Sequence, residues 1–134
     1  MQPIHNFVAG QFVPPAGGEG RYIDCTDPAT QSVYAQVPDS TAADVERAVA
    51  AAKQAFPAWS ATPAAERSRL LLRLADLIER DLEPLARAES IDSGKPISLA
   101  RAVDIPRAAS NFRFFATAIL HAQSEAHDTD GRAL

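Results

Sequence analysis

The residues best suited to chemistry gather in one stretch, residues 89–116, where charged side chains lie close to two expected helix ends. The charged groups are Asp92, Lys95, Asp104 and Arg107. Helix ends leave backbone N–H and C=O groups free to bind ions and ligands. An arginine in such a place suits a carboxylate, because its planar guanidinium can donate two parallel hydrogen bonds. We therefore take this stretch as the candidate site.

Two helix boundaries are expected inside the stretch. Gly94 is a place where a helix can stop, because glycine accepts the left-handed conformation. Pro96 has no N–H and can open the next segment. Asp104 has the type and position of a helix N-cap, with Pro106 in the first turn. The helix over residues 103–120 is therefore expected to be kinked or restarted at Pro106.

Short strands are expected before the first helix. Residues 5–13 predict a hairpin about Ala9-Gly10. Residues 22–26 and 32–37 predict two more strands, separated by a turn with Pro28 at its second position. The glycines of residues 17–20 lack the G-x-G-x-x-G spacing and a following helix, so they indicate a loop and not a phosphate site.

Thr41 is an expected helix N-cap, and after it the apolar residues recur at helical spacing. Pro57 is expected to end the first helix, Thr62-Pro63 to open the second, and a third is expected from Pro84 to Gly94. Two stripes are expected to be buried: Leu70, Leu71, Leu74, Leu77 and Ile78 in the second helix, and Phe112, Phe115, Ile119 and Leu120 in the fourth. On the exposed side of the second helix, Asp76 and Arg80 have the spacing of an ion pair.

Several simpler sites are excluded by spacing. Cys25 is the single thiol and lies in a β-prone run without an activating base, so a structural role is expected. The three histidines have no metal-ligand spacing. Ser93-Gly94-Lys95 lacks the upstream glycine of a P-loop, and residues 128–131 lack the other acidic ligands of an EF-hand. No catalytic triad supports an independent hydrolase.

Composition places the chain among ordinary globular proteins. It has 134 residues, of which 46% are hydrophobic and 22% charged, enough for one domain with a core. A net charge of −4 gives no reason to expect a nucleic acid or an acidic membrane surface as partner. No apolar run is long enough to span a membrane, and no secretory signal is expected. One cysteine fits the reducing cytoplasm.

Seven segments in a fixed order carry a family resemblance. They are Asp27-Pro28-Ala29-Thr30, Val37-Pro38, residues 44–52, Phe56-Pro57-Ala58-Trp59, Glu66-Arg67, Leu74-Ala75-Asp76-Leu77 and Asp92-Ser93-Gly94-Lys95-Pro96. From about Phe7 to its end, the chain resembles the N-terminal segment of the aldehyde dehydrogenase superfamily. Within it, Asp104-Ile105-Pro106-Arg107 and residues 111–116 are similar to the branch that oxidises 2-aminomuconate or 2-hydroxymuconate semialdehyde.

The resemblance implies an α/β fold: a β-hairpin and short strands followed by about four helices. Residues 1–134 would open a Rossmann-like NAD(P)-binding domain. The implied activity is oxidation of an aldehyde to a carboxylate through a cysteine thiolate, with NAD or NADP as hydride acceptor. Family members carry the catalytic and cofactor-binding groups farther along the chain, so none is assigned here. A fragment without activity of its own is expected, and a homodimer or homotetramer for the full-length form.

The resemblance also implies two binding sites. In the muconic semialdehyde branch, the arginine at the position of Arg107 contacts the substrate carboxylate, whereas Arg113 points to another helix face. The alternative is that Arg107 pairs with Asp104 or with solvent. In several family members, positions matching Cys25, Thr26 and Asp92 hold Na⁺ or K⁺, and carbonyl and carboxylate oxygens suit such a hard cation. The alternative is that Asp92 caps a helix or pairs with a base.

Two further alternatives stay open. The chain can be a stand-alone helical binding module without catalysis, which should fold cooperatively as a monodisperse species. Within the dehydrogenase interpretation, betaine aldehyde, succinate semialdehyde and aliphatic aldehydes are alternative substrates, because enzymes for these share most of the N-terminal pattern.

Overall fold

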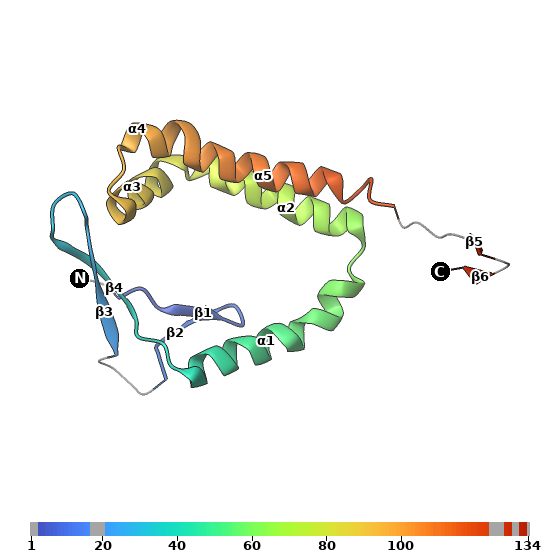
Figure 1. The fold of residues 1–134 in the computed structure, drawn as a ribbon, viewed down its shortest axis with the longest axis horizontal. Helices are drawn as coiled ribbons and strands as arrows, with labels where there is room; N and C mark the ends of the chain where they lie inside the picture. Colours follow the sequence, from blue (N-terminus) through green and yellow to red (C-terminus); the bar gives the residue numbers. More distant parts are fainter. Residues whose placement is uncertain (1–2, 17–20, 124–127, 130–131, 134) are drawn as a thin grey trace.

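The computed structural model describes residues 3–16, 21–123, 128–129 and 132–133. Short antiparallel strand pairs come first and a series of helices follows (Figure 1). The strand pairs are β1 (Asn6–Val8) with β2 (Gln11–Val13), β3 (Tyr22–Thr26) with β4 (Val33–Pro38), and β5 (Asp128–Thr129) with β6 (Arg132–Ala133). The expected order of strands and helices is confirmed.

The first hairpin turns on two residues with positive φ, Ala9 at 52° and Gly10 at 80°. Two such residues in a two-residue loop match the right-handed twist of the flanking strands. The turn sets the register, so that Phe7 lies opposite Phe12 with ring centroids 5.0 Å apart. The hairpin predicted for residues 5–13 is therefore confirmed.

The helices are α1 (Ala42–Ala61), α2 (Ala64–Arg80), α3 (Leu82–Ser93), α4 (Ile97–Leu99), the π-helix η1 (Ala100–Asp104) and α5 (Ile105–Ala118). Thr41 is the N-cap of α1 as predicted, in a capping box with Asp44. The prediction that Pro57 ends α1 is wrong, because the helix continues to Ala61. Pro57 and Lys53 are both exposed, so the carbonyl that loses its usual donor at Pro57 stays open to water.

Asp104 is not a helix N-cap, which corrects the sequence prediction. Its φ of −66° and ψ of −51° are helical, and its side chain makes no capping hydrogen bond. The Ile105 N–H donates to the Ala100 carbonyl across the π-turn, so α4, η1 and α5 form one continuous helical stretch. The break expected near Pro106 is therefore a widened turn, and Arg107 does not lie beside free N–H groups.

Alanines form the buried apolar part of the described chain. Helices α2 and α5 run side by side (Figure 1), and Ala75 of α2 is fully buried together with Ala109 and Ala116 of α5. Small side chains let two helices approach closely, and the larger ones then project to the sides.

The predicted leucine and aromatic stripes are not buried in this chain. Leu70 is 51% exposed, Leu74 is 39% exposed and Phe115 is 62% exposed. No helix in the described ranges is both long and apolar enough to cross a membrane.

Candidate functional site

The loop between α3 and α4 is fixed by Lys95. Its Nζ lies 2.7 Å from Glu89 Oε1 on α3 and 2.8 Å from Asp104 Oδ2 at the end of η1. The hydrogen bond to Asp104, followed by that to Glu89, raises the pKa of Lys95 against the opposing effect of desolvation. The Ser90 hydroxyl donates to the Lys95 carbonyl at 2.7 Å, so the backbone of the loop is held as well. One ammonium group thus joins α3 to the helical stretch that carries Arg107.

Gly94 allows this loop to turn and lets a second segment approach it. The residue is the C-cap of α3 with φ of 72°, as the sequence predicted. A Cβ built on Gly94 would lie 3.0 Å from the Pro28 Cβ. The turn after β3 therefore lies directly against the end of α3.

Arg107 is exposed near the start of α5. Among the residues that the structure describes, no carboxylate forms an ion pair with it. Asp104, the neighbour expected as an alternative partner, is bound to Lys95 instead. Arg107 is thus exposed and has no ion-pair partner among the described residues.

Arg113 has a different role. It pairs with Asp76 at 2.8 Å and with Glu79 at 2.5 Å, both on α2, and these hydrogen bonds raise its pKa, Glu79 contributing most. Its charge is thus used to hold α5 against α2. The predicted pair of Asp76 with Arg80 is wrong, because Arg80 bonds to the adjacent Asp81.

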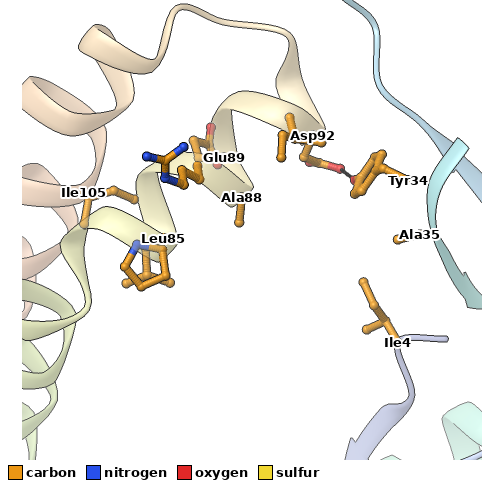
Figure 2. Close-up of a pocket in the computed structure, with 11 residues that line it drawn as sticks. Ile4, Tyr34, Ala35, Leu85, Ala88, Glu89, Asp92 and Ile105 are labelled. Carbon is orange, nitrogen blue, oxygen red and sulfur yellow. Dashed lines mark hydrogen bonds between the residues drawn. The ribbon is translucent and has the colours of Figure 1, made fainter. Parts of the chain in front are cut away.

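Two of the three residues predicted to hold a cation lie near one hydroxyl group. Tyr34 on β4 donates a 2.5 Å hydrogen bond to Asp92 Oδ1 (Figure 2). The hydrogen bond to Asp92 is the main cause that raises the pKa of Tyr34 to about 12, and the nearby Cys25 thiol adds to it. Asp92 thus binds a hydroxyl and not a base. Thr26, the third residue, follows Cys25 across an irregularity in the β3–β4 register.

An open, mainly apolar groove of about 750 Å³ lies beside this hydrogen bond. Figure 2 shows side chains of α3, among them Leu85 and Ala88, facing Ile4 and Ala35 across it. Its lining contains Tyr34, Glu89 and Asp92 but no His, Cys or Ser. It is suited to contact with an apolar surface.

The strands of the described residues pair two by two in antiparallel sheets, and no parallel strand–helix–strand unit with a glycine-rich phosphate turn occurs among them. Within the same ranges, no group of three or more His, Cys, Asp or Glu side chains could hold a metal ion.

The profile of the aldehyde dehydrogenase family matches residues 13–133, almost the whole chain. The chain belongs to the aldehyde dehydrogenase family. Among curated relatives of this chain, 2-aminomuconic semialdehyde dehydrogenase of Bos taurus is 52% identical over 127 residues, which are 95% of this chain and 25% of that protein. Acetaldehyde dehydrogenase 2 of Cupriavidus necator is 46% identical over 118 residues, 88% of this chain and 23% of that protein.

Solved aldehyde dehydrogenase structures share the fold. PnpE in complex with nicotinamide adenine dinucleotide superposes with a TM-score of 0.90 at 44% identity, over 97% of this chain and 26% of that one. A putative aldehyde dehydrogenase from Burkholderia cenocepacia gives 0.89 at 47% identity, over 96% of this chain and 26% of that one. The chain thus has the expected fold of an N-terminal portion of an aldehyde dehydrogenase, and spans about a quarter of the length of the curated relatives it matches.

Proposed function

We propose that this chain is the opening segment of an NAD(P)-dependent dehydrogenase that oxidises a carboxylate-bearing aldehyde, of the muconic semialdehyde type, to the acid. The observation that carries the proposal is the free guanidinium of Arg107. It pairs with no described carboxylate, although Asp104 lies three residues away. The high identity to proteins named 2-aminomuconic semialdehyde dehydrogenase supports the same substrate class.

Arg107 would bind the carboxylate at the end of the substrate remote from the aldehyde. Its two parallel N–H donors match the two oxygens of a carboxylate, so binding also orients the long axis of the substrate. When bound, NAD(P) supplies a hydride acceptor. We expect this chain to contribute substrate binding and packing, and we expect no turnover from it alone. The complete enzyme is expected to be a homodimer or homotetramer.

In the test, this chain replaces the matching quarter of a 2-aminomuconic semialdehyde dehydrogenase, which gives a full-length chimeric enzyme. The Arg107→Ala variant of this chimeric enzyme is compared with the chimeric enzyme itself. For the semialdehyde, kcat/KM should fall by roughly tens to thousands-fold, about 2–4 kcal/mol for a lost charge-assisted pair. A simple aldehyde without a carboxylate should be nearly unaffected. Arg107→Lys is the control for charge without the planar fork, and should recover part of the loss. Equal losses on both aldehydes would contradict the proposal.

A helical binding module remains the second candidate, because α1 exposes a row of large apolar side chains. They are Val45, Val49, Phe56 and Trp59. Contiguous apolar surface of this kind usually marks contact with another protein surface. A monodisperse chain that melts cooperatively by itself would favour the module, whereas association or a non-cooperative melt would favour a segment that packs against the rest of a dehydrogenase.

A further inference from the structure

Asp104 and Arg107 lie three residues apart on one helical stretch, a spacing at which opposite charges commonly pair. The pair does not form: Asp104 Oδ2 lies 2.8 Å from Lys95 Nζ instead. Arg107 remains exposed and without a carboxylate partner among the described residues. Arg107 has the sequence spacing of a partner for Asp104, but Lys95 is the cation that binds this carboxylate.

The surroundings of Lys95 explain why it binds Asp104. Glu89 fixes the ammonium group from the side of α3, and the side chain of Lys95 is 27% exposed. Its carbonyl accepts the hydrogen bond of Ser90, so the backbone of the loop loses little further freedom when the ion pair forms. Arg107, by contrast, would have to give up hydration and side-chain entropy to reach Asp104.

The widened turn before α5 contributes to the same arrangement. Asp104 is the last residue of η1, and a π-turn adds a residue to the helical repeat. The turn changes the direction in which Asp104 projects, compared with a regular α-helix, and Lys95 binds it there. Such turns occur often at functional sites.

We propose that Lys95 is a positioning residue for substrate recognition, which holds Asp104 and thereby leaves the Arg107 guanidinium free for a substrate carboxylate. This inference rests on the proposed function, because it needs Arg107 as the substrate anchor. Without Lys95, Asp104 is an internal competitor: its carboxylate pairs with Arg107 and opposes a second negative charge at the same place.

The experiment uses the full-length chimeric enzyme, in which this chain replaces the matching quarter of a 2-aminomuconic semialdehyde dehydrogenase, and its variant Lys95→Met. KM for a carboxylate-bearing semialdehyde should rise by roughly three- to tenfold with little change in kcat, the effect of one partly screened charge near the binding group. KM for a simple aldehyde should not change. In Lys95→Met/Asp104→Asn, the competing carboxylate is gone and KM should return close to its original value.

A matched control separates this competition from a general change of charge. Lys95→Met/Glu89→Gln has the same net charge as the rescued variant, but Glu89 lies on α3 and not three residues before Arg107. In this control variant, KM for the semialdehyde should return much less toward its original value. Equal rescue by both double variants would overturn the proposal, because long-range charge alone would then explain the effect.

Two more outcomes keep the test decisive if Lys95→Met folds poorly. Asp104→Asn alone should leave KM for the semialdehyde unchanged or lower, because Lys95 already holds that carboxylate. A clear rise would overturn the proposal. Failure of the proposed function is seen separately, as equal losses in Arg107→Ala on both aldehydes. If Arg107→Ala is selective for the semialdehyde and Lys95→Met is not, the anchor stands and the role of Lys95 is wrong.

Discussion

The Tyr34 hydroxyl donates a 2.5 Å hydrogen bond to Asp92 Oδ1 and so joins strand β4 to the last turn of helix α3, 58 residues farther along the chain. Next to it, Pro28 packs against Gly94, which ends the same helix. The β3–β4 pair therefore supports the loop that carries Lys95. Through Lys95 and Asp104, this support reaches the helical stretch of Arg107.

The first prediction concerns the ionisation of Tyr34. Its pKa is raised to about 12, because the Asp92 carboxylate accepts a hydrogen bond from the neutral hydroxyl and disfavours a second negative charge. A raised acid pKa stabilises the folded state below the ordinary tyrosine value, and that contribution is lost as pH rises from about 10 to about 12. Ultraviolet titration of tyrosinate should show a late step that Tyr34→Phe removes and Asp92→Asn moves to lower pH. A late step that persists in Tyr34→Phe would contradict this.

The second prediction separates backbone strain from packing at Gly94. Gly94→Ala should destabilise the chain by more than about 1–2 kcal/mol, the cost of a left-handed residue with a Cβ, because the new methyl group also meets Pro28. Gly10→Ala is the matched control: its φ is 80° but nothing lies within 4 Å of the new Cβ. Chemical denaturation should give the larger loss for Gly94→Ala. Equal losses would show that contact with Pro28 costs nothing.

Local rules predicted the strands and most helix ends, because the residues that decide them are adjacent in sequence. The Ala9-Gly10 turn, the Thr41 cap and the Gly94 stop depend only on local conformation. Pro57 shows the limit of such rules. A proline removes one helical hydrogen bond, and the exposed helix α1 tolerates the loss at Pro57.

The sequence pattern indicated residues 89–116 as a candidate site, but not the contacts that the structure shows there. Arg107 was expected beside free N–H groups at a helix start, whereas the structure has a π-turn there. A π-turn leaves no clear mark in composition or spacing. The partners of Asp104 and Asp76 depend on long side chains, Lys95 and Arg113, that reach across from other segments. Such contacts follow from tertiary packing and not from helix spacing.

The third prediction concerns the buried carboxylate of Asp44. Its side chain is 3% exposed and accepts hydrogen bonds from the N–H groups of Ala16 and Thr41, while Arg47 lies 3.1 Å away. These contacts, the Thr41 N–H first, lower its pKa. A lowered acid pKa stabilises the fold above the ordinary aspartate value, near 4, and this contribution is lost as pH falls through the folded-state pKa.

Asp44→Asn should therefore lower Tm by about 5 °C or more at neutral pH, and the difference from the unmodified chain should shrink under acid conditions. Thermal melts followed by circular dichroism over a pH series provide the measurement. Asp39→Asn is a suitable control, because Asp39 forms an exposed pair with Arg21. The same loss for both variants, or a gap that does not depend on pH, would rule out this account of Asp44.

The last prediction is that Asp92, with the backbone oxygens of Cys25 and Thr26, holds Na⁺ or K⁺. Tyr34 occupies one lone pair of Asp92 Oδ1, and the rest of the exposed carboxylate can accept a hard cation. A cation that binds only the folded state raises Tm. In the full-length chimeric enzyme that contains this chain, Tm should be higher in KCl or NaCl than in choline chloride of equal ionic strength. This difference in Tm should vanish in Asp92→Asn. The variant Tyr34→Phe keeps the Asp92 carboxylate and should retain the difference in Tm between the salts. If Asp92→Asn shifts Tm equally in all three salts, then Asp92 supports the fold through Tyr34 and binds no cation.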